Sequence, residues 1–89
     1  MVITRSFNVA NRLGIHARVA AKLVQTANEF KSKILLEANG QQVNASSILG
    51  ILTLACPKGS YISVFVEGSD AEAAIAAFSQ LFADKFGEE

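Results

Sequence analysis

His16, the only histidine of the chain, is the side chain best suited to chemistry. A neutral imidazole offers a nitrogen nucleophile near pH 7. His16 stands just before a helical pattern that begins at Ala17, and the free N–H groups and dipole of a helix N-terminus favour a bound anion. The guanidinium of Arg18 adds a planar fork that fits phosphate oxygens. The spacing of these residues predicts an imidazole that carries a phosphoryl group.

A second interpretation is that His16 only caps the helix or packs against the fold, which is the commoner role of a single histidine. The adjoining Gly14 and Arg18 favour the chemical role. Because helix amides disfavour an imidazolium, we expect a neutral, nucleophilic ring. The sequence has no other histidine and no pair of carboxylates with catalytic spacing. We therefore expect no free-standing enzyme, and partner enzymes must supply the remaining groups.

Size and composition indicate one domain that spans residues 1–89. Apolar residues make up 51% of the chain, which is enough for a hydrophobic core. Eight basic and eight acidic residues give a formal net charge of zero without a basic stripe, which argues against nucleic-acid binding. Cys56 is the only cysteine, so an internal disulfide and a cysteine-rich metal site are excluded. We expect Cys56 to be a small buried residue, and we expect no metal and no cofactor.

Targeting signals are not evident in the sequence. The N-terminal residues carry no signal-peptide pattern, and no apolar run approaches the ~20 residues that cross a bilayer. The single thiol agrees with a reducing compartment. We therefore expect a soluble cytoplasmic monomer that does not insert into a membrane.

Hydrophobic periodicity predicts four strands and three helices in the order β-α-β-β-α-β-α. Asn39-Gly40, between the second and third strands, predicts a tight hairpin because both residues tolerate positive φ. The predicted fold is α+β: a two-layer open-faced sandwich whose four-stranded antiparallel sheet is covered on one face by helices. The predicted strands are 2–9, 34–38, 41–44 and 61–67, and the predicted helices are 17–30, 48–54 and a third that begins at 71.

The last predicted helix has a distinct start and end. Ser69 and Glu72 have the spacing of a capping box, which predicts reciprocal capping at its N-terminus. Gly87 and the two glutamates that follow it are expected to fray.

The segment 46–54 is unusually apolar for a short helix, since its residues leave almost no polar face. We expect some of these side chains to be exposed and to form a docking surface, although a wholly buried helix would also explain the pattern. Ser46 or Ser47 is expected to cap this helix. Phosphorylation of Ser47 is a second interpretation, because a phosphate there would place a dianion beside the apolar side chains.

Two signatures make the chain resemble the HPr family, the histidine-containing phosphocarriers of the bacterial phosphoenolpyruvate-dependent sugar phosphotransferase system. Gly-Ile-His-Ala-Arg-Val-Ala at 14–20 is similar to the family's active-site signature. The segment 40–55, with Ser-Ile-Leu-Gly-Ile-Leu-Thr-Leu-Ala at its end, is similar to the family's serine signature. The resemblance covers essentially the whole chain and keeps the same order of elements.

The resemblance implies that His16 takes a phosphoryl group on Nδ1 from enzyme I and passes it to sugar-specific EIIA domains. It implies that Arg18 and the backbone amide of Ala17 contact the phosphate, and that a serine kinase/phosphorylase modifies Ser47. It also implies a partner-docking surface beside these sites. The docking residues are expected to be Ile48, Leu49, Leu52 and Ala21.

The chain departs from the family signature at Val19, where the family usually has proline. Valine restores a backbone donor, so the rate or lifetime of phosphorylation is expected to differ. Two other functions stay open: a carrier of a nitrogen-related phosphotransfer chain, and a regulatory binding protein that no longer transfers phosphate. Ser47 with its apolar run favours the sugar branch, and the intact His16 and Arg18 argue against a pure binding protein.

Overall fold

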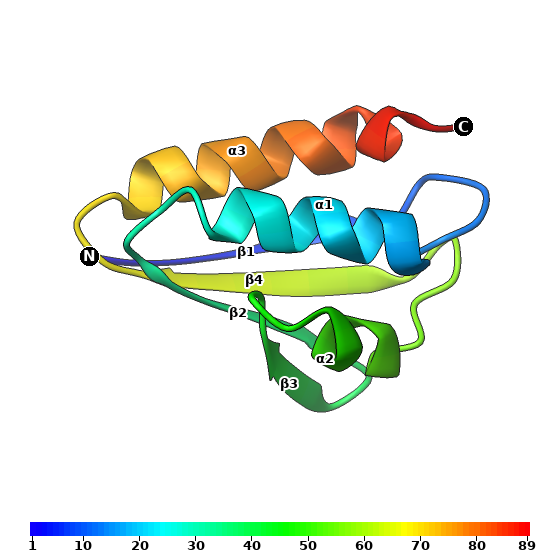
Figure 1. The fold of residues 1–89 in the computed structure, drawn as a ribbon, viewed down its shortest axis with the longest axis horizontal. Helices are drawn as coiled ribbons and strands as arrows, with labels where there is room; N and C mark the ends of the chain where they lie inside the picture. Colours follow the sequence, from blue (N-terminus) through cyan, green and yellow to red (C-terminus); the bar gives the residue numbers. More distant parts are fainter.

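Two layers make up the structure, with helices on one side of a four-stranded sheet (Figure 1). The computed structural model describes all residues 1–89. The predicted α+β sandwich and its element order are confirmed, and no helix is long and apolar enough to cross a membrane. The strands are β1 (Val2–Asn8), β2 (Lys33–Ala38), β3 (Gln41–Asn44) and β4 (Tyr61–Glu67). The helices are α1 (Ala17–Ala27), α2 (Ile48–Thr53) and α3 (Ala71–Ala83), followed by a 3-10 turn, Lys85–Gly87.

The sheet has the strand order β1-β4-β2-β3, and every neighbouring pair is antiparallel. The predicted hairpin joins β2 to β3, with Ala38 paired to Gln41. Asn39 and Gly40 form its turn with φ values of 54° and 76°. Positive φ at both positions is the geometry that matches the twist of two-residue hairpins.

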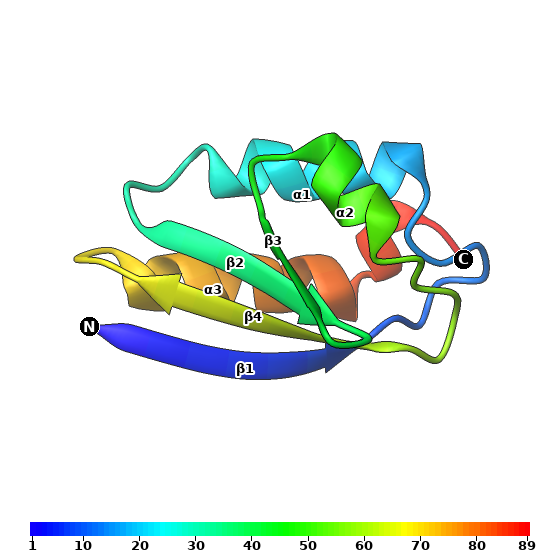
Figure 2. The same cartoon turned by 90° about the horizontal axis from the view of Figure 1, so that it is seen from below.

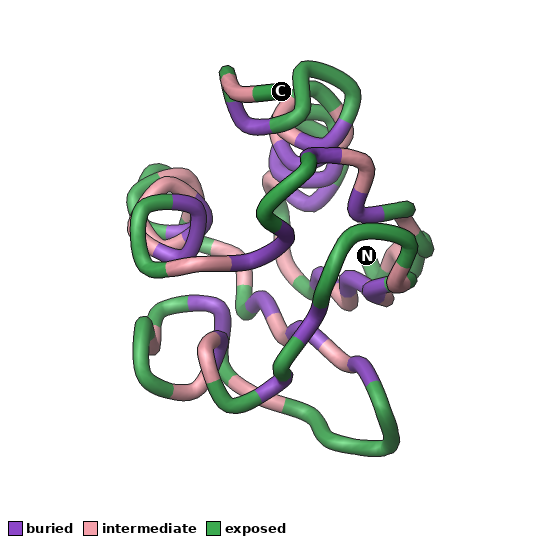
Figure 3. The backbone as a smooth tube through the Cα atoms, turned by 90° about the vertical axis from the view of Figure 1, so that its right-hand side faces the viewer, coloured by how far each residue is buried: buried purple, intermediate pink, exposed green.

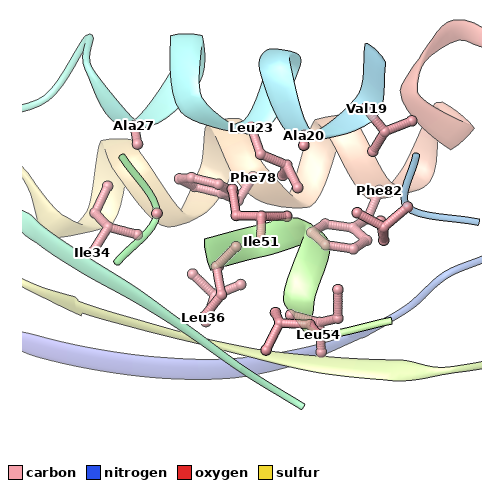
Figure 4. Packing of buried hydrophobic residues seen from close by; sticks show 14 of the residues in the cluster. Val19, Ala20, Leu23, Ala27, Ile34, Leu36, Ile51, Leu54, Phe78 and Phe82 are labelled. Atoms are coloured by element: carbon pink, nitrogen blue, oxygen red, sulfur yellow. The ribbon is translucent and has the colours of Figure 1, made fainter. Parts of the chain in front are cut away.

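The core lies between the sheet and the helices. Alternate residues of β2 and β4, such as Leu36 and Val64, are fully buried, and those between them are half-buried or exposed. In Figure 4 the side chains of Leu23 in α1, Ile51 in α2 and Phe78 in α3 converge above the sheet. Figure 3 shows that the buried segments face inward and the exposed ones outward. One apolar face per strand and one apolar stripe per helix therefore explain the two layers.

The first predicted helix is three residues too long. α1 ends at Ala27, and the amides of Glu29 and Phe30 donate to the carbonyls of Thr26 and Ala27, three residues earlier. These bonds form a tight turn in place of a further α-helical turn. Phe30 still packs against the core, which is why its apolar spacing resembles a continued helix.

The predicted capping box is wrong. Asp70 is the N-cap residue of α3, and its side chain makes no hydrogen bond to that helix. Its carboxylate accepts hydrogen bonds from the amides of Lys31 and Ser32, at 2.8 and 3.0 Å, and from the Ser32 hydroxyl. The Ser32 hydroxyl first, and then the Lys31 amide, lower the pKa of Asp70. Asp70 thus links the start of α3 to the loop that follows α1.

The C-terminal residues are docked, contrary to the expectation that they fray. Phe86 is buried and packs edge-on against Phe82, with ring centroids 4.9 Å apart. The ammonium of Lys22 in α1 donates to the carbonyl of Phe86. Figures 1 and 2 both place the C-terminus beside the loop that leads into α1. The end of the chain therefore lies next to His16.

Candidate functional site

The loop before α1 is fixed by contact with the segment Cys56-Pro57. Ile15 donates its amide hydrogen to the Cys56 carbonyl, at 2.9 Å. Gly14 has a φ of +69°, and a Cβ there would lie 2.6 Å from the Cys56 oxygen and 2.8 Å from the Pro57 Cα. Glycine is therefore required for both the backbone conformation and the close contact. This contact places His16 at the start of α1.

His16 caps α1 through its own side chain. Its Nδ1 accepts a hydrogen bond from the Arg18 amide at 3.3 Å, and its Nε2 lies 2.8 and 3.0 Å from the two carboxylate oxygens of Glu88. An amide only donates and an ionised carboxylate only accepts, so these contacts fit a neutral ring with its hydrogen on Nε2. The lone pair of Nδ1 consequently points at the first amides of the helix. This arrangement suits a nucleophilic Nδ1 facing an anion-binding helix end.

Glu88 and Asn11 belong to the site although the sequence did not indicate either of them. Asn11 is fully buried, and its amide group donates to the Gly14 carbonyl at 2.7 Å and to Glu88 Oε1 at 2.9 Å. The hydrogen bonds from His16 and then Asn11 lower the pKa of Glu88. Seventy-two positions separate His16 from Glu88 in the chain, so no local motif connects them.

The Asn11 side chain is held in one orientation. Both of its amide hydrogens are used, whereas its Oδ1 is buried without a hydrogen-bond partner. An unpaired buried acceptor costs about 1–3 kcal/mol. The opposite orientation would place that oxygen against the oxygens of Gly14 and Glu88. The contact between Asn11 and Glu88 is therefore a fixed feature of the site.

Arg18 and Ala17 occupy the exposed first turn of α1. The Arg18 side chain is 74% exposed, and its guanidinium is 4.0 Å from Glu88 Oε2. The first-turn amides of Ala17 and Val19 donate to no acceptor within the protein. The free amides of this turn and the exposed Arg18 guanidinium can together surround the oxygens of a phosphoryl group on Nδ1. The Val19 side chain, in contrast, is fully buried.

Ser47 is the N-cap of α2, and this selects Ser47 from the two predicted caps, Ser46 and Ser47. Its Oγ accepts a hydrogen bond from the Gly50 amide at 2.9 Å. A Cβ on Gly50 would lie 3.0 Å from the same Oγ, so glycine leaves room beside the hydroxyl. Ser46 donates to Asn28 Oδ1 at 3.4 Å, just after α1 ends. α1 is about 16 Å long for its 11 residues, so His16 lies at its start and the contact of Ser46 with Asn28 lies at its end.

The predicted docking residues lie on α1 and on α2, the helix that Ser47 caps. Leu49 is 78% exposed and Ile48 is 41% exposed, which confirms that the short helix is not wholly buried. Leu52 and Ala21 are half-buried. α2 packs against α1, so these four side chains lie on neighbouring helices. We call them the α1–α2 apolar surface.

The buried thiol, the acidic side chains and the surface cavity add no further groups to the site. Cys56 is buried, as expected, and its burial raises the pKa of the thiol. The protein has no group of three or more His, Cys, Asp or Glu side chains arranged to hold a metal ion. A shallow cavity of about 100 Å³ lies on the sheet between Leu35 and Phe65, and none of its lining residues belongs to the site around His16.

Comparison with known proteins gives a consistent result. The family described as "PTS HPr component phosphorylation site" matches residues 3–84. A phosphocarrier protein HPr of Treponema pallidum (strain Nichols) is 44% identical over 99% of this chain and 100% of that protein. One of Xylella fastidiosa (strain Temecula1) is 42% identical over 99% of both chains. The crystal structure of HPr-C-His from Thermoanaerobacter tengcongensis has a TM-score of 0.92 and 42% identity over 98% of both chains. The chain therefore belongs to the HPr family of phosphocarrier proteins of the phosphotransferase system.

Proposed function

We propose that His16 carries the phosphoryl group, which it receives on Nδ1 from enzyme I and passes to EIIA domains. The observation that carries this proposal is the position of Nδ1, which faces the Arg18 amide at the N-terminus of α1. Neither a metal nor a second catalytic group is needed on this chain, because the donor and acceptor proteins supply the rest of the chemistry.

In the proposed transfer, the Nδ1 lone pair attacks phosphorus and the bond from phosphorus to the donor nitrogen breaks. The electron pair of that bond stays with the donor. The Arg18 amide, released from Nδ1, and the free Ala17 amide then donate to the phosphoryl oxygens. The exposed Arg18 guanidinium closes over the same oxygens and balances their charge. The next acceptor reverses these steps.

The α1–α2 apolar surface is proposed to dock enzyme I and the EIIA domains. Leu49 supports this role because a leucine that is 78% exposed gains hydrophobic free energy when a partner covers it. The surface is on the helix that follows Ser47 and on α1, whose first residues flank His16. A partner bound there is therefore close enough to exchange phosphate with His16.

Regulation at Ser47 is proposed as a second role of the same surface. The Ser47 hydroxyl accepts from the Gly50 amide and donates to no group of the protein. A phosphate on this oxygen would remain at the start of α2, next to the exposed Ile48 and Leu49. A dianion there disfavours the docking of an apolar or acidic partner surface. Incubation with a bacterial HPr kinase/phosphorylase and ATP tests this role, and Ser47→Ala must abolish the modification.

The decisive experiment for the carrier role is intact-protein mass spectrometry after incubation with phosphoenolpyruvate and a bacterial enzyme I. We expect one acid-labile phosphate, and we expect His16→Ala to lose it while keeping its fold. Phosphate that persists in His16→Ala would place the nucleophile elsewhere. A folded protein that takes no phosphate from an active enzyme I would favour a regulatory binding protein. Transfer to an EIIA of the nitrogen-related chain, and to no sugar-specific one, would favour that branch.

A further inference from the structure

Glu88 contacts the ring nitrogen of His16 that does not receive phosphate in the proposed reaction. Its two carboxylate oxygens lie 2.8 and 3.0 Å from Nε2, on the far side of the ring from the Arg18 amide. The two ring nitrogens thus have separate partners, and phosphate on Nδ1 leaves the contact at Nε2 intact. The contact between Glu88 and Nε2 can therefore persist in the phosphorylated form of His16.

Several independent contacts hold the chain end that carries Glu88. Asn11 donates to Glu88 Oε1 at 2.9 Å from a fully buried position. The ammonium of Lys22 donates to the Phe86 carbonyl, and the Arg12 amide donates to the Glu89 carbonyl. Phe86 itself is buried in the core. The carboxylate is consequently placed by the fold and not by the His16 contact alone.

We propose that Glu88 is a positioning residue that keeps the hydrogen on Nε2 while Nδ1 carries the phosphoryl group. The inference rests on the proposed carrier function of His16. An anion 2.8 Å from Nε2 stabilises the cationic phosphoimidazolium ring, in which Nε2 keeps its hydrogen. It disfavours the neutral phosphoimidazole, whose Nε2 lone pair would face two carboxylate oxygens.

The protonation of Nε2 decides how readily the phosphoryl group leaves. When an acceptor attacks phosphorus, the P–Nδ1 bond breaks and its electron pair returns to Nδ1. With a hydrogen on Nε2 the ring departs as neutral imidazole, and no proton is exchanged in either direction of transfer. Without that hydrogen the ring must depart as an imidazolate anion, which is a far poorer leaving group. Glu88 thereby keeps the phosphoryl group ready for transfer.

The charges around this pair agree with an ionised Glu88. The Arg18 guanidinium lies 4.0 Å from Oε2, and the Lys22 ammonium is bound to the neighbouring Phe86 carbonyl. The hydrogen bonds from His16 and Asn11 hold the pKa of Glu88 below its ordinary value. The carboxylate therefore carries its negative charge at neutral pH.

The test compares Glu88→Gln with the wild-type protein and with Glu89→Gln. An uncharged amide can donate to an Nε2 lone pair or accept from an Nε2 hydrogen, so the preference for the protonated ring disappears in Glu88→Gln. Glu89 is exposed, and its hydrogen bond with the Arg12 amide is made by its backbone oxygen, which makes Glu89→Gln a matched loss of side-chain charge. Each protein is phosphorylated with enzyme I and phosphoenolpyruvate and then freed of both. The lifetime of the phosphohistidine is followed by ³¹P NMR at mildly alkaline pH, and the protonation of Nε2 by ¹⁵N NMR.

We expect the phosphohistidine of Glu88→Gln to live about fivefold longer, in line with the replacement of a charge-assisted hydrogen bond by a neutral one. We also expect its Nε2 resonance to move toward that of an unprotonated nitrogen, a change that a merely structural role would not produce. Equal lifetimes and equal Nε2 shifts in the three proteins would overturn the inference and leave the carrier function standing. A wild-type protein that takes no phosphate would overturn the carrier function and the inference with it.

Discussion

Ile15 donates its amide hydrogen to the carbonyl of Cys56 at 2.9 Å, so the residue before His16 is tied to the segment after α2. Gly14 makes this contact sterically feasible. Replacing Gly14 with alanine adds a Cβ 2.6 Å from the Cys56 oxygen and forces a left-handed backbone on a residue that disfavours it. We expect Gly14→Ala to lose at least about 2 kcal/mol of unfolding free energy. Urea denaturation measures this loss.

Gly59→Ala is the matched control for Gly14→Ala. Gly59 has a φ of +93°, and no atom lies within 4 Å of the position of its Cβ. This variant therefore shows the backbone cost without the steric contact. Equal losses in the two variants would contradict the contribution of the contact with Cys56.

Removal of the Arg18 charge should slow phosphoryl transfer without changing stability. The Arg18 side chain is 74% exposed, so Arg18→Gln loses few packing contacts. We expect the rates of phosphorylation and of transfer to EIIA to fall about tenfold, as for the loss of one charge-assisted hydrogen bond. Stopped-flow or quench-flow assays with enzyme I measure both rates. Arg5→Gln, which changes another exposed arginine, this one in β1, is the control, and equal effects of the two changes would refute the role of Arg18.

The site could be predicted from the sequence where its residues are neighbours in the chain. His16 and Arg18 stand at the start of one helix, and the composition of that turn already indicates anion binding. Glu88 reaches His16 only because Phe86, at a φ of 57°, turns the chain and packs against Phe82. Hydrophobic periodicity contains no information about such a turn, so the sequence alone predicts a frayed tail.

The elements of the fold followed from the same local patterns, and the errors arose at their ends. Asp70 resembles part of a helix cap in the sequence, yet its carboxylate binds the amides of Lys31 and Ser32, which are distant in the chain. Phe30 has the spacing of a helical residue, but the helix ends at Ala27. Long-range hydrogen bonds and turns decide these boundaries, and neither is encoded in the spacing of apolar residues.

Asp70 should make the stability of the protein depend on pH in the acid range. The pKa of its carboxyl is lowered from the ordinary value of 3.8, mainly by the Ser32 hydroxyl and the Lys31 amide. The stabilisation is complete above pH 3.8 and is lost as the pH falls through the lower pKa of the folded state, because the unfolded state binds the proton first. We expect Asp70→Asn to lose stability less steeply than the wild type below that pH.

Thermal unfolding from neutral to strongly acidic pH measures the effect of Asp70→Asn. Asp84→Asn is the control, since the Asp84 carboxylate accepts hydrogen bonds only from the exposed Gln80 side chain. If the unfolding temperature falls with acid pH equally steeply in the wild type and in Asp70→Asn, the proposed contribution of the Asp70 carboxylate is contradicted.

Proline at position 19 should be compatible with the fold. The Val19 amide donates to no acceptor in the protein, so proline removes no hydrogen bond there. The Val19 side chain is fully buried, and we expect the smaller ring to cost at most about 1.5 kcal/mol. Phosphorylation by enzyme I should be retained or faster than in the wild type.

Ala20→Pro is the contrasting variant for Val19→Pro. The Ala20 amide donates to the His16 carbonyl at 2.9 Å, and a proline there should cost about 3 kcal/mol. Urea denaturation of the two variants gives the comparison. Loss of folding in Val19→Pro would show that this first turn needs the freedom of a non-proline residue.

Leu49 gives the most direct test of the proposed docking surface. Leu49 is 78% exposed, so Leu49→Ser should change the unfolding free energy by no more than about 0.5 kcal/mol. Loss of one leucine contact with enzyme I should raise the KM for this protein about tenfold and leave kcat nearly unchanged. Val2→Ser removes an apolar side chain that is 67% exposed at the N-terminal end of β1, away from the α1–α2 apolar surface. Equal KM values for the two variants in a steady-state assay with enzyme I would place the docking surface elsewhere. An effect confined to Leu49→Ser would assign partner recognition to α2 and leave phosphoryl chemistry to His16.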